Sequence, residues 1–453
     1  MINRKLLVII TIVSITISFI LHMPIEAQET LFGKPIITPI YSDIVDSYYR
    51  KVFMDKKVCD LALKNTSLKD TIWINSDTAR RLCLGEKVLP IIYHDYSLAL
   101  PPFSGFLWFI SSSFSLVISN YNSMYSPYTD PELRSLSITI YYIIMSIFIF
   151  GSAILLAMAL SEISNYINIK DHRLLYILPL LPSFIVYGIY GTEIIAGSLI
   201  IFSILMFFKK RYLLSGLTSG LSVATNLFST IPVIIIVYEL IELKKGLEYA
   251  YRYLLGFTAI FASYLVIVLI NPPLLSKIFI GSNDLMCENC IFLYLAGSPG
   301  NPLSRSLSIV FIVILTLLTM ILYTKDHDFN NIIYRKIVIG LLAVITFHYM
   351  FKPQYFLFLT FSLVILLSLK EFLYYLFIDL LNSLIILLWF KDKELRILFN
   401  FLGSKIQYSP LSPDSPIQII AFTRNILLLI MLISLFARYM TLKKDYRNYL
   451  ISS

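Results

Sequence analysis

The sequence predicts an all-α polytopic membrane protein with about 12 transmembrane helices, within a range of roughly 10–13. Of the 453 residues, 57% are hydrophobic and 14% are charged, and the mean hydropathy is +0.77. A soluble domain with this composition would not stay in solution. Apolar segments close to the ~20 residues that span a bilayer also recur along the chain. The classes of protein that this composition leaves open are transporters, membrane enzymes and membrane scaffolds.

The first apolar run sets the domain organisation. It follows Arg4 and Lys5, and a long, mostly polar segment separates it from the next apolar run. Cleavage near Ala27 would make it a signal peptide, but no clear small-x-small site follows, and we interpret it as an anchor. We expect a first transmembrane helix, an exterior loop, a helix bundle and a cytoplasmic tail at 1–21, 22–135, 136–438 and 439–453.

Loop charge orients the expected spans. Basic residues gather in the loops on one side, as in Lys209, Lys210 and Arg211, so the positive-inside rule places both termini in the cytoplasm. Asp379 and Arg424 fall within spans and should face polar partners inside the bundle. The expected spans are 6–21, 136–160, 174–190, 193–208, 212–226, 229–243, 251–270, 305–323, 337–350, 355–369, 372–390 and 417–438.

Two segments admit more than one interpretation. The stretch from Tyr212 to Glu242 forms either two short helices that meet near Asn226 or one long tilted helix. Phe103 to Ser119 is apolar and long enough to cross, but crossing would move Lys209 to Arg211 outside. We therefore expect an interfacial helix within the exterior loop.

All four cysteines fall in loops that we place outside. Disulfides between Cys59 and Cys83 and within Cys287-Glu288-Asn289-Cys290 are the natural pairing in an oxidising compartment. Four cysteines allow three connectivities, and the sequence alone leaves them open. A four-thiolate zinc site is a weaker match because only one CxxC is present.

Several exterior residues are suited to chemistry. Asp43 and Asp46 follow the first helix, Glu193 opens the fourth span at its outer end, Arg305 opens the eighth, and 352–355 link the ninth and tenth. A carboxylate there can take the proton of an acceptor hydroxyl, and a cation can receive the charge of a leaving phosphate.

Simpler roles stay open for the same residues. Asp43 and Asp46 are also typical of a helix start, and His94 with Asp95 is an ordinary hydrogen-bonded pair. Lys352 would also suit the membrane interface by snorkelling.

Four motifs occur in order along about residues 1–370. They are Tyr41-Ser42-Asp43-Ile44, Tyr93-His94-Asp95-Tyr96 with Pro101-Pro102, Gly191-Thr192-Glu193, and Lys352-Pro353-Gln354-Tyr355-Phe356. These motifs resemble elements of the integral-membrane glycosyltransferases of the GT-C superfamily. The resemblance is to mannosyltransferases that use polyprenyl-phosphate sugars, including the enzyme that adds the first mannose to glycosylphosphatidylinositol. Val45 and Asp46 depart from the Tyr-Thr-Asp-Ile-Asp element of that family, and Asn226 stands where it carries a lysine.

The resemblance implies a GT-C-like fold and transfer of a sugar, mannose in that family, from a polyprenyl-phosphate donor to a lipid, glycan or protein acceptor. Asp43 or Asp46 would be the base, and Lys352 and Arg305 would hold the phosphate. No cofactor, metal or nucleic acid is implied, and protein partners are not specified. Further substrate contacts are expected at Tyr41, Asp95, Tyr96, Glu193, Gln354 and Tyr355.

We expect a multi-pass location in the plasma membrane of a prokaryote, or in the endoplasmic reticulum of a eukaryote, with the site on the exterior or luminal face. A non-catalytic scaffold of a glycan-assembly complex is the main alternative. A secondary transporter is a weaker one, because paired inverted halves and midplane charges are not evident.

Overall fold

A computed structural model describes most of the chain. The described residues are 3–64, 66–68, 71–86, 88–119, 131–167, 169, 171–243, 246–272, 286–324, 328–399 and 409–441. The expected tail at 439–453 therefore lies outside them beyond residue 441. Among the described residues, the strands are limited to β1 (Tyr323–Thr324) and β2 (Met440–Thr441), which pair antiparallel. The described fold is all-α apart from this short pair.

Within the described part of the chain, seven helices are long and apolar enough to cross a membrane. The described structure therefore suits a polytopic membrane protein, whereas the expected number of about twelve spans stays a prediction. The seven are α1 (Arg4–Leu21), α7 (Pro131–Ile163), α13 (Gly246–Phe261) continued by α14 (Ser263–Ile270), α17 (Pro302–Ile321), α18 (Phe329–Phe347), α20 (Leu369–Trp389) and α22 (Pro416–Tyr439).

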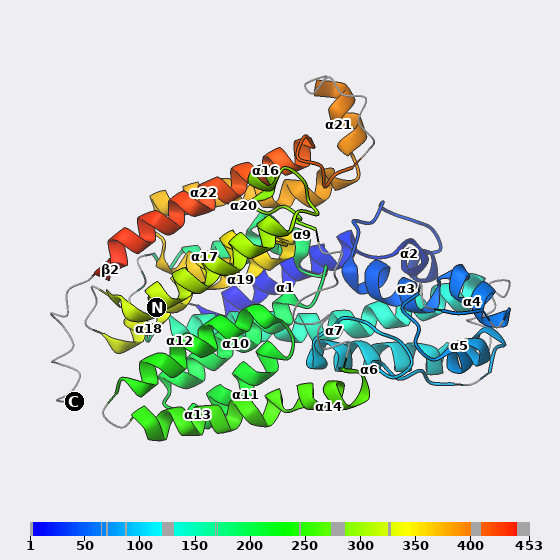
Figure 1. Ribbon diagram of the computed structural model, residues 1–453, viewed down its shortest axis with the longest axis horizontal. Helices are drawn as coiled ribbons and strands as arrows, with labels where there is room; N and C mark the ends of the chain where they lie inside the picture. Colours follow the sequence, from blue (N-terminus) through cyan, green and yellow to red (C-terminus); the bar gives the residue numbers. More distant parts are fainter. Residues whose placement is uncertain are drawn as a thin grey trace.

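Shorter apolar helices fill the bundle between these seven. Nearly every side chain of α10 (Glu193–Phe208) is buried, although this helix has only 16 residues. The other short bundle elements are α8 (Leu174–Ile177), η3 (Leu178–Leu180), α9 (Pro182–Tyr187), α11 (Tyr212–Val223), η4 (Leu227–Ser229), α12 (Thr230–Ile241), α16 (Leu293–Ala296), η5 (Pro353–Tyr355), α19 (Phe356–Leu363) and η6 (Val364–Leu366). The helix α21 (Asp392–Phe399) projects from the bundle (Figure 1).

Two expected boundaries change, and one open alternative is resolved. The span expected at 174–190 is interrupted, because Pro182 follows Leu181 in an extended conformation and the helix cannot continue through it. The span expected at 337–350 begins earlier, at Phe329, where the Asp328 side chain caps the first turn. The stretch between Tyr212 and Glu242 forms two helices, since Asn226 between them is extended.

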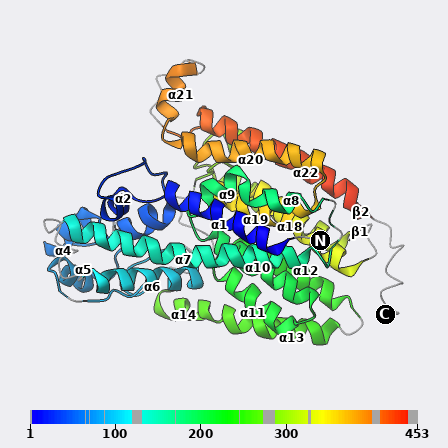
Figure 2. The same cartoon turned by 180° about the vertical axis from the view of Figure 1, so that it is seen from behind.

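The helices run along the long axis of the molecule, so the bundle has two ends (Figure 1). α1 begins and α22 ends near β1 and β2 at one end, and the view from behind shows the same arrangement (Figure 2). The opposite end carries the segment between α1 and α7. That segment contains α2 (Ile25–Phe32), η1 (Asp43–Arg50), α3 (Lys51–Phe53), α4 (Lys56–Leu63), α5 (Ser76–Cys83) and α6 (Pro102–Ile118).

Local contacts hold this first-loop segment on the bundle. Within the segment, a disulfide joins Cys59 of α4 to Cys83 of α5, and elsewhere a second joins Cys287 to Cys290. Of the three possible connectivities, this is the one expected as the natural pairing. α6 packs along α7, where the Ser115 hydroxyl donates to the carbonyl of Ser137 at 2.7 Å. In Figure 1 α6 lies with the first-loop elements at that end.

The alternation of helices predicts opposite sidedness for the two ends. A cysteine in place of Arg211, in the turn before α11, should react only from the cytoplasmic side, and one in place of Lys34 only from outside. Both positions are exposed, and the native cysteines are disulfide-bonded. Labelling with a membrane-impermeant maleimide in intact cells and in inverted vesicles measures this, and labelling of both positions from one side would contradict the topology.

Candidate functional site

The segment that carries Asp43 is held against the bend before α10. The Ser42 hydroxyl lies 3.1 Å from the carbonyl oxygens of both Ile189 and Tyr190, and the backbone N–H of Ile44 donates to the carbonyl of Tyr190 at 3.3 Å. From α7, the Tyr141 hydroxyl donates to the carbonyl of Ile44 at 2.9 Å. Asp43 therefore begins η1 at a fixed point on the bundle.

Asp43 meets the link between α18 and α19. Its side chain is buried, and its Oδ2 accepts a hydrogen bond from Gln354 Nε2 at 3.1 Å. Its Oδ1 accepts from the Ser47 hydroxyl at 2.9 Å, and Ser47 is hydrogen-bonded to the hydroxyl of Tyr41. Each carboxylate oxygen has two lone pairs, so both oxygens retain acceptor capacity. The structure thus brings Asp43 and Gln354 together.

Asp46 has different neighbours. Its Oδ1 lies 3.1 Å from Arg50 Nε, and Arg50 also pairs with Glu26 at 2.7 Å. Burial raises the pKa of Asp46, although Ser42 and Arg50 oppose the rise. With Tyr41 it lines a cavity of about 330 Å³ that Asp43 does not line.

Lys352 lies two residues before Gln354 and is half-buried. Burial disfavours its ammonium form, yet nearby Tyr355 and Asp43 raise the pKa of Lys352 well above its ordinary range. Tyr355 packs against Phe228 with ring centroids 4.6 Å apart. A lysine cation therefore stands beside the Asp43–Gln354 contact.

Two glutamates share this electrostatic environment. Glu193 opens α10, is 7% exposed, and interacts with the charges of Asp43 and Lys352. Its Oε2 has no hydrogen-bond partner among the described residues. A Cβ at Gly191 would lie 2.2 Å from that oxygen, so a larger residue there would displace the Glu193 carboxylate.

Glu288 is a member of the site that the sequence reasoning missed. Its carbonyl accepts from the Phe351 N–H at 2.9 Å, which brings the Cys287–Cys290 hairpin beside Lys352. Burial raises the pKa of the Glu288 carboxyl, and Lys352 opposes this rise. The available signal was an acid between two disulfide-bonded cysteines in an exterior loop. Asp43, Glu193, Glu288, Lys352 and Gln354 are called the acid–lysine cluster below.

Arg305 approaches the same turn from α17. Its guanidinium carbon lies 5.8 Å from the ring centroid of Tyr349, three residues before Lys352. Among the described residues, no group of three or more His, Cys, Asp or Glu side chains is placed to hold a metal ion.

Asp95 and Tyr96 lie within the packing of the first-loop segment. The Asp95 carboxylate accepts from the Thr78 hydroxyl at 3.1 Å, from Asn75 Nδ2 at 3.0 Å and from the Ile91 N–H at 2.7 Å. The fully buried Tyr96 ring packs on Trp73 and Trp108. The structure therefore brings neither residue into contact with Asp43, in contrast to Gln354.

Replacing Asp95 by Ala should destabilise the first-loop segment by about 2–4 kcal/mol, because several buried donors lose their acceptor. Limited proteolysis of the segment measures the change. The exposed Asp77, in the first turn of α5, is the matched control, and its replacement by Ala should cost about 1 kcal/mol or less. Equal protease resistance of wild type and Asp95→Ala would contradict the structural role.

No protein-family model, curated protein or solved structure matches this chain.

Proposed function

We propose that the protein is a membrane glycosyltransferase that moves a sugar from a polyprenyl-phosphate donor to a lipid, glycan or protein acceptor. The observation that supports this most is the hydrogen bond between Asp43 and Gln354, two residues beyond Lys352. It brings a candidate base to the turn that carries a candidate phosphate-binding cation, at one end of an apolar bundle. A lipid-linked donor keeps its tail in the bilayer and presents its phosphate at such an end.

The proposed reaction is a single displacement. The acceptor hydroxyl oxygen attacks the anomeric carbon of the donor sugar, and its proton passes to Asp43. The bond between that carbon and the phosphate oxygen breaks, and the polyprenyl phosphate leaves with the electron pair. Lys352, with Arg305 nearby, offsets the negative charge that develops on the phosphate.

The remaining cluster residues suit sugar binding. The unpartnered Oε2 of Glu193 can accept a sugar hydroxyl, which would satisfy a buried polar atom that otherwise costs free energy. Tyr355 offers a ring beside Lys352 for the sugar face. Asp46 is the weaker candidate base, since it pairs with Arg50 and lines a different cavity.

The charge pattern of the loops supports an exterior site. The first-loop segment, in which Asp43 begins η1, lies at the end of the bundle opposite the start of α1 (Figure 1). With the termini in the cytoplasm by the positive-inside rule, that end faces the outside of a plasma membrane or the lumen of the endoplasmic reticulum. A lipid-linked donor fits this side, where nucleotide sugars are absent.

Asp43→Asn should lower kcat by at least about 10²-fold, because the acceptor loses its base. Asp46→Asn should lower kcat less than about fivefold, because a partly exposed ion pair contributes about 1 kcal/mol or less. Transfer of radiolabelled sugar from a polyprenyl-phosphate donor by the purified protein measures both. Full activity of Asp43→Asn would exclude Asp43 as the base, and no transfer by wild type with any such donor would favour a scaffold.

Lys352→Met should lower kcat/KM for the donor by about 10- to 100-fold, since a hydrogen bond to a charged group contributes about 1.5–3 kcal/mol. The exposed Lys34 of the first-loop segment is the control, and Lys34→Met should leave kcat/KM unchanged. The same transfer assay serves, with donor concentration varied. A Lys352→Met enzyme with wild-type kcat/KM would remove the phosphate role of Lys352.

A further inference from the structure

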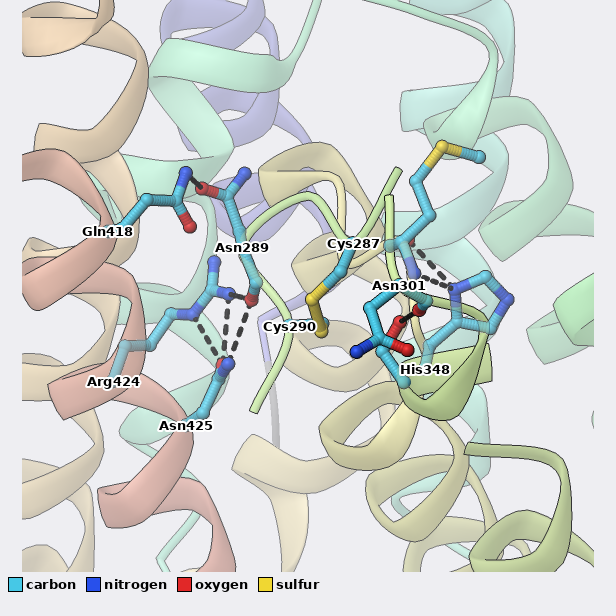
Figure 3. The surroundings of a disulfide bond; sticks show 10 residues. Cys287, Asn289, Cys290, Asn301, His348, Gln418, Arg424 and Asn425 are labelled. Atoms are coloured by element: carbon cyan, nitrogen blue, oxygen red, sulfur yellow. Dashed lines mark hydrogen bonds between the residues drawn. A yellow bond between two sulfur atoms is a disulfide. The ribbon is translucent and has the colours of Figure 1, made fainter. Parts of the chain in front are cut away.

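Arg424 of α22 is a fully buried cation whose partners among the described residues are neutral. Its Nη1 donates to Asn382 Oδ1 at 2.7 Å, and its Nη2 donates to the carbonyl of Asn289 at 3.1 Å. Its Nε also donates to Asn425 Oδ1 at 3.1 Å. Figure 3 shows the guanidinium facing Asn289 and Asn425. A cation buried at such a cost calls for an explanation.

One branch of these contacts leads to both sides of Lys352. The Arg424 guanidinium carbon lies 3.7 Å from the ring centroid of Phe351, the residue before Lys352. Asn382, which accepts from Arg424, donates through Nδ2 to the carbonyl of Pro353 at 3.0 Å, the residue after Lys352. Arg424 therefore fixes the turn directly and through Asn382.

The other branch leads to Glu288. The Asn289 carbonyl also accepts from Asn425 Nδ2 at 2.8 Å, and Asn289 Oδ1 accepts from Gln418 Nε2 at 3.2 Å. The Cys287–Cys290 disulfide closes this hairpin, and Figure 3 shows it beside the α22 side chains. The hairpin in turn pairs with the 350–351 backbone through Glu288.

We infer that Arg424 is a positioning residue, which holds the Lys352 turn and the Glu288 hairpin in register so that both side chains lie beside Asp43 within the acid–lysine cluster. The effect on catalysis rests on the proposed glycosyl transfer, whereas the positioning of Lys352 does not. Arg424 touches neither Asp43 nor Glu193 in the described contacts, so it acts through Phe351, Asn382 and Asn289.

The geometry requires an arginine. The planar guanidinium places several N–H donors in a fixed fork and stacks its face on a ring, and a lysine ammonium does not combine these contacts. Neutral groups connect Arg424 to Asp379. Asn382 Nδ2 lies 3.0 Å from the Ser183 hydroxyl, and the Ser183 N–H donates to Asp379 Oδ2 at 2.9 Å. Asp379 and Arg424 thus both lie inside the bundle and have polar partners there.

Thiol labelling tests the positioning without reference to transfer. A cysteine in place of Lys352 adds one thiol to a chain whose described cysteines are all disulfide-bonded. Its rate of reaction with a water-soluble maleimide reports how readily the turn opens. Arg424→Met should raise this rate by at least about tenfold, because the turn loses charge-assisted contacts that oppose local opening. Arg424→Lys should give an intermediate rise, since it restores the charge but not the fork.

Two controls separate local from global loosening. Arg335 at the other end of the bundle also lies over a ring, that of Tyr439 at 4.4 Å, and Arg335→Met should leave labelling at position 352 unchanged. A cysteine in place of the buried Ser203 should stay unreactive in Arg424→Met. The inference would be overturned if neither Arg424→Met nor Arg424→Lys accelerated labelling at position 352. It would also be overturned if Arg424→Met accelerated labelling at position 203 to the same extent.

Transfer kinetics then test the consequence for catalysis. With native Lys352, Arg424→Met should lower kcat about tenfold with a smaller change in donor KM, because Lys352 acts mainly on the departing phosphate. If Arg424→Met accelerates labelling but the wild type shows no transfer activity, the positioning role of Arg424 stands and the proposed function is refuted. Faster labelling with wild-type kcat in Arg424→Met would overturn the catalytic part of the inference.

Discussion

Polar groups inside an apolar bundle must find their partners within the protein. At one end of this bundle they form two networks that meet at the turn 351–354. One runs from Tyr41 through Ser47 and Asp43 to Gln354, and the other runs from Asn289 through Arg424 and Asn382 to Pro353. Segments far apart in the sequence are therefore fixed at one point, and the arrangement of the acid–lysine cluster depends on it.

The charges in this cluster constrain what it can bind. Asp43, Glu193 and Glu288 surround one lysine, so a free phosphate would meet more carboxylates than cations there. Arg305 beside Tyr349 and Arg424 beneath Phe351 add positive charge next to the turn. The unpartnered Oε2 of Glu193 can accept from a ligand hydroxyl. The proposed sugar-phosphate donor would suit this arrangement, since its hydroxyls can donate to the acids and its phosphate can pair with the cations.

Composition and loop charge were sufficient to predict a helical, membrane-spanning architecture, because both depend on the bilayer rather than on packing. The predicted topology places Asp43 and Gln354 on one membrane face, and the structure brings these two residues into contact. Hydropathy stays high through the break near Pro182, so hydropathy alone did not reveal it, although the proline itself is a helix-breaking signal. The contacts of Glu288 and Arg424 involve backbone groups, asparagines and a ring, which carry no charge pattern. Asp95 was expected at the substrate from the resemblance, and its buried donors are invisible in the sequence.

The resemblance to glycosyltransferases ends near residue 370, yet α20 and α22 lie beyond it and contact the turn at 351–354. Contacts from these two helices are enough to fix the turn because fixing it costs little conformational entropy. The Lys352 turn and the four-residue hairpin at 287–290 are short, and the disulfide already restricts the hairpin. Few further contacts are then needed to fix both, and one guanidinium that reaches both segments supplies them. A buried arginine near the end of the chain can thereby determine where a lysine about seventy residues earlier presents its charge.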